Sequence, residues 1–271
     1  MISPAAFAQQ SGKSWHILLN PRNDLYPRYV ADPRRSRHIV TILRAFDSGV
    51  PLTGNTRYSL SIGGQYPLLR LYRGENPENG WQVDVEGRFY EQFDIENNLD
   101  ELGHDARIGG IASKKFGDRM AIRLTYVHTS SHVGDEYLLR NQLTSRPNAR
   151  KEEIAAGLSW QVTPRWRTYG EIGDGLILGP LNKPWRIQTG LEYEGLPFGR
   201  RARWYAATDV TTFQESGWQP SVNLQTGIVF PFPEAGRTYR FGAEVYRGRA
   251  QLDSFLNHRE GYIVVGTWLD L

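Results

Sequence analysis

The feature that most constrains this chain is a strict alternation of apolar and charged residues over positions 81–90. The odd positions hold Trp, Val, Val, Gly and Phe, whereas Asp84, Glu86 and Arg88 occupy even positions. Side chains alternate between the two faces of a β-strand, so this segment predicts a strand with one apolar and one charged face. A row of charges cannot enter an apolar core unpaired. The charged face therefore requires water or a polar, charge-paired interior.

The same period of two recurs along most of the chain. Several apolar faces begin or end with Trp, Tyr or Phe, as in transmembrane barrels, where aromatic residues mark the boundary between lipid and water. Many of the predicted strands approach the ~10 residues that a tilted membrane strand needs. We therefore predict an all-β protein, a single transmembrane antiparallel β-barrel of about twelve strands. The predicted strands are 57–63, 66–73, 81–90, 104–113, 119–130, 150–162, 165–173, 185–193, 203–210, 219–230, 239–245 and 260–271.

Composition and loop lengths separate this barrel from other classes. The mean hydropathy is −0.51, and no run approaches the ~20 apolar residues of a spanning helix. A soluble β-sandwich also alternates, but its strands are nearer ~5–6 residues. Barrels place short turns at one end and long loops at the other. The long links 91–103, 131–149, 174–184 and 247–260 all fall at one end, and only a hairpin predicted at Gly63-Gly64-Gln65 breaks the pattern.

Three segments follow from this reading. Residues 1–8 end in Ala-Phe-Ala, which has the form of a signal-peptidase site, and are expected to be a signal-peptide remnant. Residues 9–55, interrupted by four prolines, are expected to be an irregular segment or a plug, and residues 56–271 the barrel. Residues 266–271 resemble the C-terminal assembly signal of outer-membrane proteins. The expected location is the outer membrane of a Gram-negative bacterium, and the expected folding partner is the barrel assembly machinery.

The strongest candidate for chemistry is the end of the strand 119–130. His128 and Ser130 share its outward, lipid-facing side, and a histidine two residues from a serine can act as its base. Glu152 on the next strand is the candidate that orients the imidazole, and Asp135, Glu136 and Asn141 in the following loop are the alternatives. The adjoining Ser131 and His132 are expected to bind the ligand. The alternative is an ordinary polar rim at the water interface.

The pair His128–Ser130 resembles the catalytic strand of outer-membrane phospholipase A and of the lipid A 3-O-deacylase. Both carry His and Ser two apart on an outward face, follow the serine with Asn, and take a third member from the adjacent strand. Here Ser131 stands in place of that Asn. The resemblance implies hydrolysis of lipid acyl esters.

A metal site is a second interpretation of the same stretch. His128, His132, Asp135 and Glu136 offer nitrogen and oxygen ligands. Asp135 and Glu136 would suit calcium, which prefers carboxylate oxygens. His104 and Asp105, at the outer end of the preceding strand, are further candidates for either site. The alternative is a solvated acidic loop.

The inward-facing residues mix both signs of charge, which predicts a salt-bridged interior or a narrow channel. The net charge of +3 and the dispersed basic residues argue against nucleic acid, and the absence of cysteine excludes thiol chemistry. The sequence thus favours a non-enzymatic structural barrel or narrow pore; the alternative is an outer-leaflet lipid acyl hydrolase. Either would have outer-membrane lipids and lipopolysaccharide as partners.

Four segments together resemble a known bacterial family, the domain-of-unknown-function family 1207. They are residues 80–94, 130–141, 183–193 and 218–230, and the likeness spans most of residues 15–271. Members of this family look like secreted outer-membrane barrels. The resemblance implies the architecture and carries no activity with it.

Overall fold

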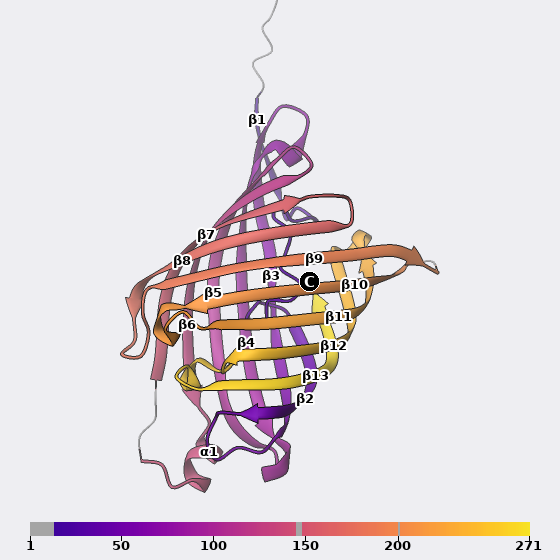
Figure 1. Ribbon diagram of the computed structural model, residues 1–271. Helices are drawn as coiled ribbons and strands as arrows, with labels where there is room; N and C mark the ends of the chain where they lie inside the picture. The colour runs from indigo at the N-terminus through magenta and orange to yellow at the C-terminus, as the bar shows by residue number, and fades with distance from the viewer. Residues whose placement is uncertain (1–13, 145–147, 200) are drawn as a thin grey trace, which may run out of the picture.

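The computed structural model describes residues 14–144, 148–199 and 201–271 (Figure 1). The expected signal-peptide remnant at residues 1–8 lies outside this part of the chain. No helix within the described residues is long and apolar enough to span a bilayer.

Twelve antiparallel strands form a closed barrel, as the sequence predicts. Each strand pairs with the next one along the chain, and the last, β13, pairs with β2 to close the sheet. A thirteenth strand, β1 (Trp15–Leu19), pairs with the far end of β3. The barrel strands are β2 (His38–Ser48), β3 (Thr56–Arg73), β4 (Trp81–Asp94), β5 (Asp100–Phe116), β6 (Met120–Val133), β7 (Asn148–Gln161), β8 (Trp166–Leu178), β9 (Trp185–Phe198), β10 (Ala202–Phe213), β11 (Pro220–Phe232), β12 (Arg237–Arg249) and β13 (Arg259–Asp270).

The hairpin predicted at Gly63-Gly64-Gln65 is wrong, because β3 runs through it as one continuous strand. Gly63 and Gly64 pair in register with Arg88 and Gly87 of β4. A Cβ on Gly63 would lie 2.4 Å from the Gly87 carbonyl oxygen. The glycine therefore permits a close approach of two backbones and does not mark a turn.

The strands predicted at 57–63 and 66–73 are therefore one strand, β3. The twelfth barrel strand is β2, which lies inside the segment expected to be irregular. Its inward residues Ile39, Leu43 and Ala45 pack in a cluster with Trp268, while Val40 and Ile42 face outward. Apolar residues on both faces obscure the alternation, and this hid the strand. The barrel wall thus begins at His38.

Residues 20–37, between β1 and β2, pass through the lumen. Leu25, Tyr26, Tyr29 and Ala31 are almost completely buried there. Hydrogen bonds join this segment, which we call the plug, to strands on all sides of the barrel. The pairs are Asn23–Arg70, Pro27–Arg167, Arg28–Gln65, Tyr29–Glu171, Val30–Glu192, Ala31–Asn223, Pro33–Arg88, Arg34–Asp253, Arg35–Asp270 and Arg37–Ser61.

The two ends of the barrel differ in their connections. One end holds the links β2–β3, β4–β5, β6–β7, β8–β9, β10–β11 and β12–β13. Each of these links has five or more residues, and the link β6–β7 contains the helix α1 (Asp135–Arg140). We call this the long-loop end. The other end, the terminal end, carries β1 at the start of the described chain, the end of β13, and the tight turns 117–119 and 162–165.

Charge pairs fill the lumen around the plug. Arg57 and Glu260 form a pair at 2.8 Å with both side chains about 1% exposed, and Arg186 contacts both Glu153 and Glu171 at 2.6–2.7 Å. Two central cavities lined by these strands and the plug hold about 60 and 20 Å³. About 10–15 Å³ of such space is enough for one water molecule, so these cavities have room for only a few waters.

Breaking the Arg57–Glu260 pair should destabilise the barrel strongly. In Glu260→Gln the Arg57 guanidinium keeps its charge but loses its buried carboxylate, which typically costs about 3–5 kcal/mol. Asp47→Asn is the matched control, because Asp47 pairs with Arg247 at 3.7 Å on exposed side chains and should cost under about 1 kcal/mol. Urea unfolding in detergent, followed by tryptophan fluorescence, measures both. Equal midpoints for the two variants would contradict the prediction.

Candidate functional site

The outward face of β6 carries an uninterrupted row of polar side chains at the long-loop end. Tyr126, His128, Ser130 and His132 alternate with inward residues that line the lumen. The structure thus places His128 and Ser130 on the outer face, where the sequence puts them. Glu152 lies on the neighbouring strand β7, directly opposite His128 in register.

Ser130 is hydrogen-bonded to His132. The distance from its Oγ to the His132 Nε2 is 3.0 Å. The sequence reads His-x-Ser-x-His, so Ser130 has an imidazole on each side along the strand. The hydrogen bond is to His132, and the expected base His128 is on the other side. A hydroxyl–imidazole contact is therefore present, and it joins Ser130 to the histidine expected to bind ligand.

His128 has the carboxylate that the sequence assigns to it. Its Nδ1 lies 3.6 Å from the Glu152 Oε1, which is an ion-pair distance and too long for a hydrogen bond. Glu152 also accepts a hydrogen bond from the Tyr126 hydroxyl. The His128 side chain is 41% exposed, so it is open to the surroundings of the barrel.

His132 is connected across the sheet to residues of β5. It pairs in register with His104, and the two rings lie 5.3 Å apart between centroids. The His104 Nδ1 lies 2.7 Å from the Glu101 Oε1. Glu101–His104 and His132–Ser130 are thus two polar contacts joined by a contact between the two imidazole rings. Sequence reasoning included His104 but missed Glu101, whose position relative to His132 depends on the strand register.

Arg150 is a second residue that sequence reasoning missed. It lies on β7 directly opposite Ser130, and its side chain is exposed. Directly opposed residues in antiparallel strands have Cβ atoms about 5 Å apart. The register therefore brings a guanidinium into the neighbourhood of the serine. Arg150 could have been found from the sequence, because it is two residues from Glu152 and therefore lies on the same face of the strand.

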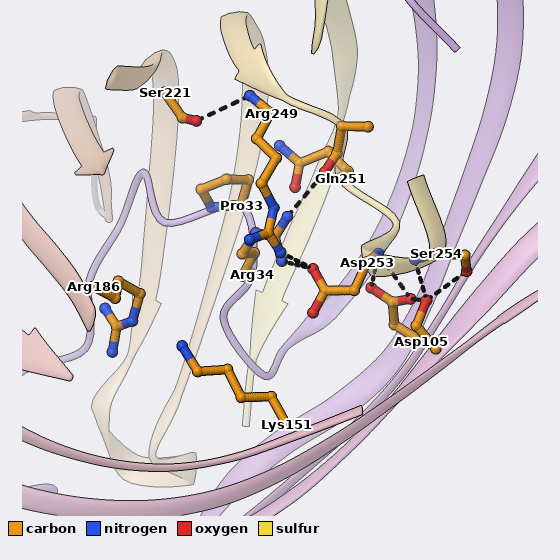
Figure 2. A network of polar contacts seen from close by, with 12 residues as sticks. Pro33, Arg34, Asp105, Lys151, Arg186, Ser221, Arg249, Gln251, Asp253 and Ser254 are labelled. Atoms are coloured by element: carbon orange, nitrogen blue, oxygen red, sulfur yellow. Dashed lines mark hydrogen bonds and ion pairs between the residues drawn. The ribbon is translucent and has the colours of Figure 1, made fainter. Parts of the chain in front are cut away.

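Ser131, expected to bind ligand beside Ser130, points the other way. Its Oγ contacts Asp105 and, at 2.6 Å, the Oγ of Ser254, both inside the barrel. Figure 2 shows this inner network, in which Asp253 lies between the guanidinium groups of Arg34 and Arg249, with Asp105 and Ser254 beside it. Alternation of side chains explains the placement, because adjacent residues of a strand cannot face the same side.

The loop above the site holds the two acidic residues expected to bind calcium. Asp135 and Glu136 form the first turn of α1, where negative charge favours the helix N-terminus. The Glu136 carboxylate accepts the backbone N–H of Glu101. Among the described residues, no group of three His, Asp or Glu side chains is arranged to hold a metal ion.

Solved structures with the same fold cover nearly the whole chain. The Salmonella typhi outer membrane phospholipase dimer with bound calcium has a TM-score of 0.59 at 12% identity, covering 91% of this chain and 95% of that chain. Outer membrane phospholipase A from Escherichia coli has a TM-score of 0.56 at 10% identity, covering 92% and 96%. At these identities the likeness establishes a shared outer-membrane barrel fold.

Sequence comparison gives the family. None of the curated proteins matches the sequence of this chain. The model of one family, described as protein of unknown function (DUF1207), matches residues 13–270. This match covers the plug, all twelve barrel strands and the polar row on β6. The chain therefore belongs to the DUF1207 family.

Proposed function

We propose that this protein is an outer-membrane barrel that hydrolyses acyl esters of lipids at its outer face, with Ser130 as the nucleophile. The observation that carries the proposal is the 3.0 Å contact between the Ser130 Oγ and the His132 imidazole, on a face that otherwise meets lipid. Barrels of this class keep both termini and the short turns in the periplasm. That orientation puts Ser130 at the level of the outer-leaflet head groups.

The chemistry follows from the residues around the serine. His132 takes the hydroxyl proton as the Ser130 Oγ attacks the ester carbonyl carbon, and the imidazolium returns that proton to the departing alcohol. Water then hydrolyses the acyl-serine to a free fatty acid, with His132 as base again. Arg150 is the cation available to the oxyanion that develops on the carbonyl oxygen. The chain Glu101–His104 holds the His132 ring in position.

The filled lumen argues against the narrow pore that the sequence also allows. The plug crosses the interior, and the two central cavities hold about 60 and 20 Å³. A solute would have to displace a buried network of ion pairs to pass. The structural barrel without activity is the remaining alternative, and the experiment below decides it.

Ser130→Ala should abolish lipid hydrolysis by the detergent-folded protein. Removing a nucleophile lowers kcat by about 10⁴-fold or more when the remaining groups cannot replace it. Release of fatty acid from phosphatidylethanolamine and from lipid A should be measured with and without calcium, which also tests the expected calcium dependence. Thr129→Ala is the matched control, since its hydroxyl lies on the same strand but faces the lumen. Absence of hydrolysis in the wild type leaves a structural barrel, and equal hydrolysis in both variants excludes Ser130 as the nucleophile.

A further inference from the structure

The barrel wall has a notch at the terminal end, on the side opposite to Ser130 along the strands. Pairing of β8 with β9 stops at Trp166 and Tyr193, although β9 continues to Phe198. The pairing of β9 with β10 also shifts register between Arg203 and Tyr205. The free edge of β9 and this bulge leave a cavity of about 380 Å³ that reaches from the outer surface to lumen residues.

The notch is lined by more positive than negative charge. Arg165, Arg167, Arg203 and Arg240 contribute to it, against Glu192 and Glu194. Arg167 pairs with Glu192, Arg203 with Glu194, and Arg240 with Asp270 outside the lining, so the lining keeps an excess of arginine. Within the described part of the chain, the Tyr205 hydroxyl and the Arg203 Nε are buried without a hydrogen-bond partner. The Tyr205 side chain is only 3% exposed. Both residues line the notch, and each of these donors lacks an acceptor that an anion would supply.

An apolar groove adjoins the notch on the outward face. The groove encloses about 320 Å³ and shares Tyr193, Ala206 and Ala207 with the notch. It exists because small side chains stand side by side across three strands: Ala206 pairs with Thr226, and Thr226 pairs with Ala243. Larger residues border it, among them Trp166, Leu191, Leu224 and Val245.

Aromatic rings mark the depth of the notch. Trp166 and Tyr193 lie 4.8 Å apart between ring centroids, and Phe198 lies 6.4 Å from Trp204. Aromatic belts in barrels sit at the level of the lipid head groups. The cationic notch is therefore at head-group depth, and the apolar groove continues toward the middle of the wall.

We propose that the notch and the groove together bind one anionic glycerophospholipid from the leaflet at the terminal end. Its phosphate accepts hydrogen bonds from the Tyr205 hydroxyl and from Arg203, and one acyl chain lies in the groove. This site is distinct from the Ser130 site, does not depend on hydrolysis, and contains no serine, cysteine or histidine among its described lining residues. The bound lipid would complete the wall where β8 ends.

Lipid retention by the folded full chain tests the proposal. Protein in dodecyl maltoside is mixed with dioleoyl phosphatidylglycerol, with dioleoylglycerol, or with inorganic phosphate, and bound molecules are counted by native mass spectrometry. We expect one phosphatidylglycerol per chain. Tyr205→Phe and Arg203→Gln should each weaken its retention about 10-fold, the loss expected for one charge-assisted hydrogen bond. Ala206→Trp should fill the groove and abolish retention.

Matched controls keep the result specific. Arg247→Gln removes an exposed arginine near the long-loop end, and Ala156→Trp adds a ring to an outward position of β7, so both should retain the lipid. Thr226→Leu replaces Ala206→Trp if the latter does not fold. Equal retention in all variants overturns the proposal. Retention of dioleoylglycerol equal to that of phosphatidylglycerol overturns it too, because the notch would then not recognise the phosphate. Binding of inorganic phosphate without phosphatidylglycerol also overturns it, because the groove would then not bind an acyl chain.

Discussion

Replacing Arg34, Arg35 and Arg37 by serine is expected to convert a closed barrel into an ion-conducting one. Arg34 pairs with Asp253, Arg35 with Asp270 at 2.6 Å, and Arg37 holds the Val30 carbonyl at 2.7 Å. These three residues anchor the end of the plug that leads into β2. Without them, Asp253 retains only Arg249 and Asp270 retains only Arg240 among the cations of the described chain, and the plug loses its side-chain attachment to both carboxylates. Single-channel recording in planar bilayers should detect openings that the wild type lacks.

The control for this variant is the triple replacement of Arg44, Arg237 and Arg247 by serine. These arginines face outward, so their loss should leave the barrel closed. A second measurement covers the case in which the plug variant does not fold. The chain has no cysteine, and Ser36 is 1% exposed, so Ser36→Cys places a single thiol inside the barrel. Slow maleimide labelling in the folded wild-type background is expected, and rapid labelling contradicts a fixed plug.

The architecture of this barrel could be predicted because alternation is a local property. In residues 81–90 the charges alone required a polar interior, and no knowledge of partners was needed. The two errors have one physical origin. β2 places Ile39 and Leu43 in the lumen against Trp268, so its pattern is not binary, and Gly63-Gly64 serves a close backbone contact. Both depend on neighbours that the local sequence does not contain.

The site was predictable only as far as side-chain direction. The period of two placed His128 and Ser130 outward and brought Glu152 beside His128. It gave no physical reason to prefer His128, the predicted base, over His132, because both histidines are two residues from Ser130. The contacts of His132 with His104, and of His104 with Glu101, depend on how β5 and β6 are aligned. Register of this kind arises from the assembled sheet.

The largest difference between two single variants is expected at these flanking histidines. His132→Gln should lower kcat for ester hydrolysis about 10⁴-fold, nearly as much as Ser130→Ala, because a serine and its base act as one unit. His128→Gln should cost only about 10-fold, since His128 contacts Glu152 and not the serine. Glutamine keeps the size and a hydrogen-bonding end in both variants. Single-turnover acylation by a short-chain nitrophenyl ester separates this step from lipid binding.

A double variant, read beside the single His132→Gln loss, tests whether Ser130 and His132 act as one unit. If His132 is the base, adding His132→Gln to Ser130→Ala should change nothing further, because the unit is already disabled. Glu101→Gln should then lower kcat more than Glu152→Gln does, since Glu101 supports His132 through His104. The reverse order, with His128→Gln and Glu152→Gln giving the large losses, would move the base to His128. That outcome requires the Ser130 side chain to rotate from His132 toward His128 when substrate binds, and the row His-x-Ser-x-His provides an imidazole on either side.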